Sequence, residues 1–406
     1  MPTSDPAQDP AAGAAGDPPT GAVRASGPCP GDPAPVPGAA RARGPAPGAP
    51  PAPGPASDRA PASTSRVRGS RARYSLVVGG LVVALAGAVV AGLALGSVRV
   101  PPGEVVRTLT GTAAPSPLRT IVLDVRLPRV LLGAVVGAGL AVVGTVLQAL
   151  VRNRLADPFL LGISSGASAG AVLVLVVGVG GGITTTVAMP AAAFAGSLVA
   201  LALVYGLARR GGAMTGGRLV LAGVTVSYIL SALTTLVLTL SARPEQFQEA
   251  LYWTLGGLGS ARWGTLVLPA AVLVLGTGVL IALGRPLDLL LTGEEGATAL
   301  GLDTGRFRAA VFVLASLVTG VLVASSGAVG FVGLLVPHAA RGAVGAAHRA
   351  LLPVAALGGA VVLVVADLAA RTVAAPQDIP VGVLTALIGG PFFLWLMRRR
   401  PEGAAV

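Results

Sequence analysis

The sequence predicts an all-α, polytopic membrane protein with ten transmembrane helices, and three observations support this fold class. Hydrophobic residues make up 53% of the 406 residues, whereas charged residues make up only 11%. A soluble domain carries about 25% charged residues, because its surface must be polar. Apolar stretches of spanning length follow one another from residue 75 almost to the end of the chain. The composition therefore excludes an ordinary soluble enzyme.

Residues 1–73 are expected to form a disordered cytoplasmic tail that is rich in proline, alanine and glycine. Seventeen of the 33 prolines precede residue 62, and such a segment cannot bury enough apolar surface to offset its ordering entropy. It is not expected to be a signal peptide, because no apolar core follows the first residues. The apolar part then occupies residues 74–400, and residues 401–406 form a short C-terminal tail.

Each transmembrane helix is expected where about 20 apolar residues can cross the ~30 Å hydrocarbon core. Glycine and alanine recur through these stretches, which lets helices approach closely in a bilayer and favours a packed bundle. The eighth stretch is the shortest and contains Pro337, which cannot donate a helical hydrogen bond. In chain order the ten predicted spans are Ser75–Val98, Val130–Leu150, Leu160–Val179, Met189–Ala208, Leu219–Leu240, Thr265–Leu283, Ala309–Ser326, Val329–Val344, Leu352–Ala369 and Val381–Met397.

The arginines predict the orientation of the spans, because cytoplasmic segments carry an excess of basic residues. All 29 basic residues are arginines. With the N-terminus inside, 17 arginines lie on inner segments and eight on outer ones. Both termini are therefore expected in the cytoplasm, as parts of a multi-pass protein of the cell membrane. The arginine excess matches the anionic inner leaflet and not a nucleic acid.

The order of small motifs indicates an inverted repeat. Arg243-Pro244 precedes two glycines and Trp263, and Pro376 precedes two glycines and Trp395. If spans two to five correspond to spans seven to ten, the shift is five helices. An odd shift inverts the topology, as in many transporters. Chance similarity between glycine-rich helices is the alternative.

The residue types exclude several kinds of chemistry. Without lysine the chain has no P-loop, so it does not bind ATP through that motif. Cys29 has no disulfide partner and two histidines are too few for a histidine-rich metal site, so no metal or other cofactor is expected. An ion-coupled secondary transporter stays an alternative, although Asp367 is the single carboxylate in the spans and makes no proton relay alone. A membrane-embedded enzyme would need clustered His, Cys or acidic residues there.

Three segments carry more specific patterns than helix packing requires. The first runs from Arg126 to Ala167, the second from Leu291 to Gly301 and the third from Gly330 to Phe393. Their signatures are RLPR at 126–129, RNRLADP at 152–158, LGISSGA at 161–167, TGEEGATALG at 292–301, GFVGLLVPH at 330–338, HR at 348–349, IPVG at 379–382 and GGPFF at 389–393.

The order and spacing of these segments resemble the FecCD family, the permease subunits of ABC importers for iron–siderophores, haem and cobalamin. The resemblance covers about residues 75–400. It implies a ten-helix permease domain that moves iron–siderophore complexes inward, with haem or cobalamin as the alternative cargo. It also implies a homodimer or a pair with a close paralogue, separate ATP-binding subunits on the cytoplasmic side, and a substrate-binding lipoprotein or periplasmic-type protein outside. The chain itself is then a transport subunit and not an enzyme.

The resemblance implies a docking site for the binding protein. Arg126, Arg129 and Arg371 match positions that meet its acidic residues, and all three fall on the predicted outer face. Such exposed ion pairs contribute about 0–1 kcal/mol each, so they serve register and steering more than affinity. Interfacial anchoring is the alternative for Arg126 and Arg129, and a local pair with Asp367 is the alternative for Arg371.

Two further sites are expected on the cytoplasmic side. A coupling helix against the ATPase is expected between spans six and seven, where two glutamates favour a helix N-terminus. A gate or pathway is expected where glycines before span five permit motion and an amide side chain lies in span two. The alternative to the coupling helix is a solvated loop. The alternative to the gate is a passive connector at the glycines, and for the amide side chain it is a hydrogen bond between helices. The expected coupling residues are Gly293, Glu294, Glu295, Ala297, Leu300 and Gly301, and the expected gate or pathway residues are Gln148, Thr215, Gly216 and Gly217.

Three positions depart from the family pattern. Arg154 stands where the family usually has proline, Gly296 where it has a larger residue, and Asp378 where glutamate is more common. His338 and His348 lie in family-like contexts, and hydrogen-bonded structural roles are expected for both.

Overall fold

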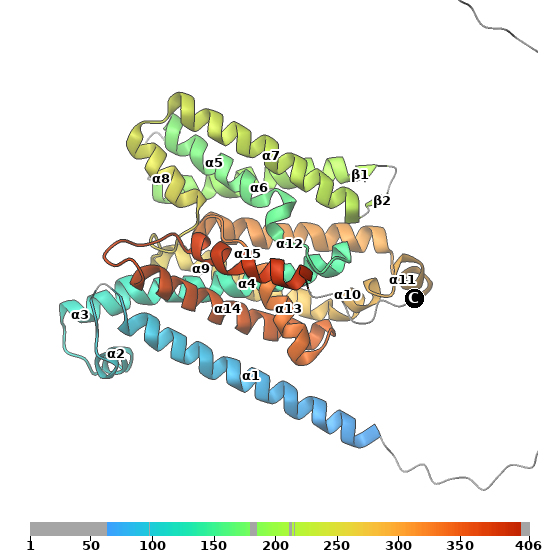
Figure 1. Cartoon of the computed structure of the whole chain (residues 1–406), viewed down its shortest axis with the longest axis horizontal. Coiled ribbons are helices and arrows are strands. Elements are labelled where there is room, and N and C mark those ends of the chain that lie inside the picture. The colour runs from blue at the N-terminus through green and yellow to red at the C-terminus, as the bar shows by residue number, and fades with distance from the viewer. Residues whose placement is uncertain (1–62, 97, 179–184, 211–212, 215, 399–406) are drawn as a thin grey trace, which may run out of the picture. The chain divides into compact units, whose positions relative to one another are not determined.

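The structure is a computed structural model that describes residues 63–96, 98–178, 185–210, 213–214 and 216–398. These residues all belong to the second of two compact units, Pro61–Val406. They are almost entirely helical, with one short antiparallel pair of strands (Figure 1). The spans are α1 (Ser63–Ala94), α4 (Leu127–Val151), α5 (Ile163–Val177), α6 (Thr185–Ala208), α7 (Gly216–Ser241), α9 (Trp263–Ala282), α12 (Thr304–Ser326), α13 (Val332–Val344), α14 (His348–Thr372) and α15 (Val381–Arg398). The connecting elements are α2 (Pro102–Leu109), α3 (Pro117–Thr120), η1 (Ile121–Arg126), η2 (Pro158–Leu161), β1 (Arg209–Arg210), β2 (Ala213–Met214), α8 (Pro244–Thr254), α10 (Gly284–Leu290) and α11 (Glu294–Ala299).

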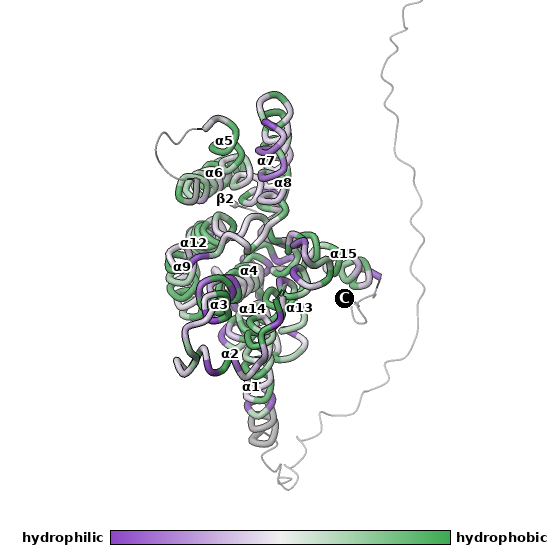
Figure 2. Tube along the Cα trace, turned by 90° about the vertical axis from the view of Figure 1, so that its left-hand side faces the viewer, coloured by the Kyte–Doolittle hydropathy of each residue, from purple (hydrophilic) through white to green (hydrophobic). Residues whose placement is uncertain are grey.

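The predicted spans are all present as helices in the described residues, in the predicted order. Among those residues, seven helices are long and apolar enough to cross a membrane, and α5 and α15 are shorter apolar helices. The remaining helix, α13, corresponds to the eighth predicted span and has 13 residues. Figure 2 shows polar residues gathered on α2, α3 and α8, which connect the spans at one end. The fold class is therefore the one that the sequence predicts.

Helix α1 begins at Ser63, so residues 63–73 form its first turns and are not part of the tail. The hydropathy criterion excluded them because arginine and serine are polar, but arginine is a good helix former. Arg73 also donates a hydrogen bond to the carbonyl oxygen of Gly342 (Nη2–O 2.8 Å), which ties this end of α1 to α13. The rest of the predicted tails, residues 1–62 and 399–406, lies outside the described residues.

The contacts between helices repeat with a shift of five spans. Helix α4 packs along α14, and its counterpart α12 packs along α6. In the same way α4 contacts α13, and α12 contacts α5. The central helices α4 and α12 also contact each other. An inverted repeat produces this pattern, because each central helix then meets the other repeat through equivalent elements.

Glycine permits the closest of these contacts. At Gly137 of α4 a Cβ atom would lie 2.2 Å from the carbonyl oxygen of Gly359 in α14. At Gly320 of α12 a Cβ atom would lie 2.5 Å from Ser197 Oγ in α6. Small residues are what allow helices to approach this closely in a bilayer. Both halves of the repeat therefore use a glycine at the contact between the central helix and its neighbour.

We expect Gly137→Ala to destabilise the bundle by about 1–3 kcal/mol, because the added methyl group has no space between the two backbones. Gly278→Ala in α9 is the matched control, since a Cβ atom there meets nothing within 4 Å. The control should be neutral or slightly stabilising, because alanine favours a helix. Thermal unfolding in detergent compares the two variants, and equal midpoints would contradict the close contact.

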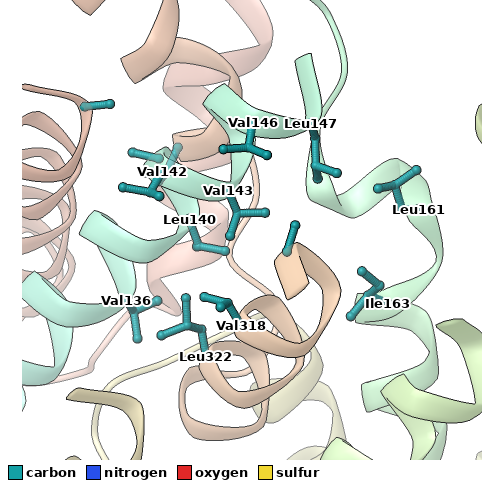
Figure 3. Close-up of a cluster of buried hydrophobic side chains, with 14 of the residues drawn as sticks. Val136, Leu140, Val142, Val143, Val146, Leu147, Leu161, Ile163, Val318 and Leu322 are labelled. Carbon is teal, nitrogen blue, oxygen red and sulfur yellow. The ribbon is translucent and has the colours of Figure 1, made fainter. Parts of the chain in front are cut away.

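The hydrophobic core surrounds α4. In Figure 3, Val136, Leu140 and Val143 of α4 gather toward Val318 and Leu322 of α12, and all five belong to one buried cluster. Burial on every side explains why the apolar residues of α4 show no single apolar face. The two central helices are thus packed directly against each other through aliphatic side chains.

The turn between α12 and α13 lies beside the middle of α4 and not at its end. Gly139 of α4 packs against Leu322 near the end of α12, and Gly144 packs against Gly333 at the start of α13. Residues 327–331 are therefore irregular backbone within the depth of the bundle. Such backbone is tolerated in a membrane only where protein buries it or where it lines water. This internal turn explains why the eighth predicted span is the shortest.

Candidate functional site

Charged side chains gather at two ends of the bundle. The arginine end is defined here by Arg126, Arg129 and Arg371, and the coupling end by Glu294 and His348. Figure 1 shows α2 and α3 at the arginine end and α10, α11 and the two strands at the opposite end. Within the described residues, no three of His, Cys, Asp and Glu gather as ligands for a metal ion.

Arg126 closes η1 immediately before α4 and is buried, with 5% of its surface exposed. Its guanidinium donates hydrogen bonds to the carbonyl oxygens of Leu93 (Nη1–O 2.7 Å) and Val98. Leu93 lies in the last turn of α1, where carbonyl groups lack a helical partner and the helix dipole favours a cation. Arg126 therefore fastens the end of α1 to the start of α4.

Arg129 and Arg371 share one carboxylate. Arg129 of α4 donates to Asp367 (Nε–Oδ1 2.9 Å) and to Asp378 (Nη1–Oδ2 2.7 Å). Arg371 follows Asp367 by one turn of α14, and its Nε lies 3.0 Å from Asp367 Oδ2 in an ion pair that is not aligned as a hydrogen bond. Its Nη2 donates to the carbonyl oxygen of Gly92 (3.1 Å). The cluster thus connects α1, α4 and α14.

The three arginines lie together at one end of the bundle, but they are not exposed as expected, and docking of the binding protein there stays a prediction. Arg126 and Arg371 are 5% and 7% exposed, and the Arg129 side chain is 14% exposed. They face inward because buried oxygens of other helices accept their hydrogen bonds, which offsets the cost of burying the charges. The local pair of Arg371 with Asp367, an open alternative, is present. Asp378, whose side chain is 52% exposed, is the accessible member of the cluster.

At the coupling end, Glu294 joins three elements. It opens α11, and its Oε1 accepts hydrogen bonds from Arg152 after α4 (3.4 Å) and from Arg308 of α12. The Arg308 side chain is only 5% exposed, so water screens its attraction to Glu294 weakly. A displacement of α11 therefore acts on the ends of both central helices.

The short helix predicted at this place is present as α11, with both glutamates in its first turn. The flanking residues Gly293 and Gly301 have φ angles of 101° and 86°, which favour glycine. Ala297 is fully buried, whereas Glu295 and Leu300 are exposed. The alternative of an unstructured solvated loop is therefore wrong, and α11 offers one face to the bundle and one to its surroundings.

A second contact at the coupling end was not predicted from the sequence. His348 Nδ1 lies 2.5 Å from Asp288 Oδ1, and the backbone N–H of His348 donates to the same oxygen (3.0 Å). Asp288 belongs to α10 and His348 opens α14, so the carboxylate holds α10 against the first turn of α14. The hydrogen-bonded role expected for His348 is confirmed. Its partner lies 60 residues earlier, and no local pattern indicates it.

Gln148 forms a hydrogen-bonded bridge inside the bundle, and 3% of its surface is exposed. Its Nε2 donates to the carbonyl oxygen of Gly333 (3.1 Å), and its Oε1 accepts from Arg341 Nη1 (2.5 Å). The alternative of a hydrogen bond between helices is therefore confirmed for Gln148. The bridge joins α4 to both the start and the second half of α13.

Of the other predicted gate residues, Gly216 and Gly217 lie at the start of α7. Thr215 is outside the described residues, and α7 begins at Gly216. Gly217 is exposed, and a Cβ atom there would meet nothing within 4 Å. Neither helix packing nor a strained φ angle requires glycine at position 217, so the gate stays a prediction.

Asp157 lies in the connection between α4 and α5 and is 8% exposed. It accepts hydrogen bonds from the backbone N–H of Phe159 (2.8 Å) and from that of Phe331. It therefore caps η2 and also holds the residue that precedes α13. Burial raises the pKa of Asp157 from 3.8 to about 6, an effect larger than that of the two hydrogen bonds, which lower it.

We expect Asp157 to make stability depend on pH between about 4 and 7. In this range the folded protein holds a proton that the unfolded chain releases near pH 3.8, so the free energy of unfolding falls as the pH rises through about 6. Asp157→Asn should lack this decline in thermal unfolding measured across the range in detergent. Asp303→Asn, which removes an exposed helix cap, is the control. An unchanged decline in Asp157→Asn would contradict the assignment.

Most of the chain is similar to permease subunits of ABC importers. A model of the FecCD transport family matches residues 80–399. The cobalamin import system permease protein BtuC of Halobacterium salinarum is 44% identical over 286 residues, which cover 70% of this chain and 75% of that protein. The hemin transport system permease protein HmuU of Yersinia pestis is 44% identical over 298 residues, which cover 73% and 88%. The Fe(3+) dicitrate transport system permease protein FecD of Escherichia coli is 38% identical over 319 residues, which cover 79% and 97%.

A solved structure has the same fold. It is described as an inward-facing conformation of a metal-chelate type ABC transporter, and it matches this chain with a TM-score of 0.69 at 30% identity. The match covers 80% of this chain and 100% of the other. The family model spans nearly all of the described residues, and the relatives align over most of their own length. The chain therefore belongs to the FecCD transport family and is a multi-pass membrane permease of an ABC importer.

Proposed function

We propose that this chain moves iron–siderophore complexes across the cell membrane into the cytoplasm, driven by separate ATP-binding subunits. The observation that carries the proposal is the ion-pair junction at Glu294, through which a partner pressing on α11 acts on both central helices. A relative named for ferric citrate supports an iron chelate as the cargo. Haem and cobalamin are the alternative cargoes, favoured by two relatives that are each 44% identical.

The ATP-binding subunits are proposed to contact α10 and α11 at the coupling end. Glu295 and Leu300 offer a charged and an apolar side chain to such a partner. Movement of the partner then reaches α4 and α12 through Glu294, and α14 through the contact of Asp288 with His348. Two global states of the bundle follow if the partner favours one of them when it binds ATP. With the coupling end inside, both termini are cytoplasmic.

The substrate-binding protein is proposed to dock at the arginine end, outside the cell membrane. Three arginines face two aspartates there, which leaves one net positive charge in the cluster. An acidic residue of the binding protein can replace Asp378 as a partner of Arg129, because Asp378 is half-exposed. Arg126 and Arg371 then contribute through the positive field that they add and through the positions of the helices that they hold.

A second copy of this chain, or a close paralogue, is proposed to complete the pathway. Large apolar side chains are exposed along α7 and α15, including Tyr228, Ile229, Leu233, Leu387 and Ile388. In a bilayer such surfaces face lipid or another helix bundle. The cargo then passes between the two copies. Thr215, Gly216 and Gly217 form the proposed gate, and the last two of them lie at the start of α7.

An ion-coupled secondary transporter is the alternative mechanism. It requires a carboxylate that takes up and releases ions along the pathway. Asp367 is instead engaged by Arg129 and by Arg371, which both hold it at the arginine end. The engagement of Asp367 therefore favours a separate ATPase subunit over ion coupling at this carboxylate.

Reconstitution in proteoliposomes tests the function. We expect the permease with its ATP-binding and binding-protein subunits to take up a radioactive iron–siderophore complex when ATP is present and not when it is absent. Labelled haem and cobalamin, tested in parallel, identify the cargo. The purified chain alone should hydrolyse no ATP and take up nothing under a proton or sodium gradient. Uptake by the chain alone under such a gradient would establish the ion-coupled alternative.

A further inference from the structure

The turn between α12 and α13 contains a residue in an unusual backbone conformation. Phe331 has a φ angle of 68°, in the left-handed region that bulky side chains rarely adopt. It lies directly before α13, and its side chain is half-buried. Such outliers persist only where neighbouring contacts hold them, and they gather at functional and moving parts of proteins. The contacts of Phe331 therefore indicate what the unusual backbone serves.

The ring of Phe331 fills a notch in α15. At Gly389 a Cβ atom would overlap the ring and would lie 2.6 Å from Phe331 Cδ1, so only glycine leaves room there. The neighbouring Gly390 differs, because a Cβ atom at that position meets nothing within 4 Å. Nearer the start of α15, a Cβ atom at Gly382 would lie 2.8 Å from the carbonyl oxygen of Ala328. Helix α15 thus lies directly against the turn at two glycines, and the ring occupies the second of these contacts.

The first half of the repeat has glycine at the equivalent place. A shift of five spans relates α5 to α13 and α7 to α15. Gly162, directly before α5, has a φ angle of 78°. A Cβ atom there would lie 3.3 Å from the carbonyl oxygen of Gly223 and 3.5 Å from Ser227 Oγ, so Gly162 faces α7 as Phe331 faces α15. Glycine adopts this backbone without a steric cost. The turn itself therefore needs no ring, and the contact with α15 is what Phe331 adds.

Helix α15 is not fastened to the bundle by charged groups. The ion pairs of the described residues join α4, α10, α11, α12 and α14 to one another or to nearby connections, and none of these pairs includes a residue of α15. Figure 2 shows α15 at the edge of the bundle, and its Leu387, Ile388 and Leu394 are exposed. A helix that is held by packing alone can slide when one of its contacts changes. The seating of the Phe331 ring is therefore well placed to control the position of α15.

We propose that Phe331 is a latch for α15. The ring at Gly389 and the left-handed backbone behind it hold α15 in one of two positions that the transport cycle uses. Helix α12 leads directly into this turn, and the junction at Glu294 holds its other end. When the ATP-binding subunits move α12, the ring leaves the notch and α15 takes its second position. This inference rests on the proposed transport function, within which Phe331 is a positioning residue.

Thermal unfolding in detergent tests the contact. Gly389→Ala should lower the midpoint by about 2–6 °C, because its methyl group takes the place of the ring. Gly390→Ala is the matched control and should leave the midpoint unchanged. Adding Phe331→Gly to Gly389→Ala removes the overlap and should recover about half of the loss or more. Phe331→Gly alone should unfold at a higher temperature than Phe331→Ala, since only glycine relieves the left-handed backbone.

Electron paramagnetic resonance between two spin labels measures the position of α15 in the permease–ATPase complex in nanodiscs. Ile388→Cys in α15 and Val365→Cys in α14 carry the labels, since both side chains are exposed, and Cys29→Ser removes the native thiol. An excess of unlabelled chain keeps one labelled copy in most complexes. We expect one distance without nucleotide and a second when ATP and vanadate trap the complex. In Phe331→Ala the second distance should appear without nucleotide, at least about tenfold above its level in the parent.

Gly170→Ala shows whether any loss of packing has the same effect. A Cβ atom at Gly170 of α5 would overlap the carbonyl oxygen of Ala192 in α6, so this variant loses stability at a contact that does not involve α15. It should keep the distances of the parent, with and without nucleotide. Gly389→Ala should instead behave as Phe331→Ala does, because both empty the notch of the ring.

Four outcomes overturn the latch. They are a parent distance that ATP and vanadate leave unchanged, equal distances in the parent and Phe331→Ala, the same shift in Gly170→Ala as in Phe331→Ala, and equal unfolding midpoints for Gly389→Ala and Gly390→Ala. A higher midpoint for Phe331→Ala than for Phe331→Gly contradicts the strained backbone on which the latch depends. The measurements need neither cargo nor binding protein. A failure of uptake with the expected distances therefore contradicts the proposed function alone, and uptake by a complex whose α15 keeps one distance contradicts the latch alone.

Discussion

Replacing Asp367 by asparagine is expected to destabilise the protein by about 3–5 kcal/mol. The substitution keeps the shape of the side chain but removes the charge that Arg129 and Arg371 share. Both guanidiniums are then left largely buried beside each other, without the carboxylate that offset their lost hydration. The loss should appear as a lower midpoint of unfolding by heat and by denaturant in detergent. It should be independent of any partner subunit.

Asp378→Asn is the matched control for this prediction, because it removes the other carboxylate that binds Arg129. The Asp378 side chain is half-exposed, so water replaces much of its contact, and a cost of about 0–1 kcal/mol is expected. A double variant, Asp367→Asn with Arg371→Met, removes a charge together with its partner and should recover part of the stability. Equal losses in the two asparagine variants would contradict a shared buried carboxylate.

The structural role of this cluster changes how docking experiments at the arginine end must be designed. Arg126 and Arg371 hold the end of α1 through the carbonyl oxygens of Leu93 and Gly92. Replacing either arginine therefore removes a charge and also frees the end of α1. Asp378 is the informative position, since its change alters the charge next to Arg129 and leaves the buried contacts in place.

Hydropathy was enough to predict the spans because most of them are long apolar windows whose signal does not depend on their neighbours. The predicted Thr265–Leu283, for example, corresponds to α9 at Trp263–Ala282. The same criterion could not show that the chain turns inside the bundle at residues 327–331. That segment is as apolar as the helices on either side, and its place is set by the contact of Gly144 with Gly333, which lie far apart in the sequence.

The candidate site was predictable where its cause is local. The two glutamates after Gly293 predict the start of α11, because acidic residues favour a helix N-terminus. The burial of the arginines has a distant cause, since Arg129 meets an aspartate 238 residues later. The partner of His348 likewise lies outside any local pattern. Motifs therefore indicated which side chains gather at each end, and tertiary contacts decided whether they face water or one another.

Replacing Glu294 by lysine is expected to lower uptake at least about tenfold, while the ATP-binding subunits continue to hydrolyse ATP. The change places a third cation against Arg152 and Arg308, and Arg308 is too buried to turn toward water. Helix α11 then loses its attachment to the ends of α4 and α12, so movement of the ATPase no longer reaches the central helices. The ratio of ATP hydrolysed to cargo transported in proteoliposomes measures this loss of coupling.

Glu295→Lys makes the same change of charge in the same turn of α11. It shows whether α11 acts by attracting the ATPase or through its link to α4 and α12. Glu295 is exposed and has no ion pair among the described residues, so its substitution should leave uptake within about twofold of the parent. If Glu295→Lys uncouples and Glu294→Lys does not, the acidic turn acts by attracting the ATPase and the junction to α4 and α12 is not the route.

Combining Glu294→Lys with Arg308→Glu restores an opposite pair at the junction. Partial recovery of uptake in that double variant is what a mechanical link requires, because an attraction to the ATPase would not depend on a side chain of α12.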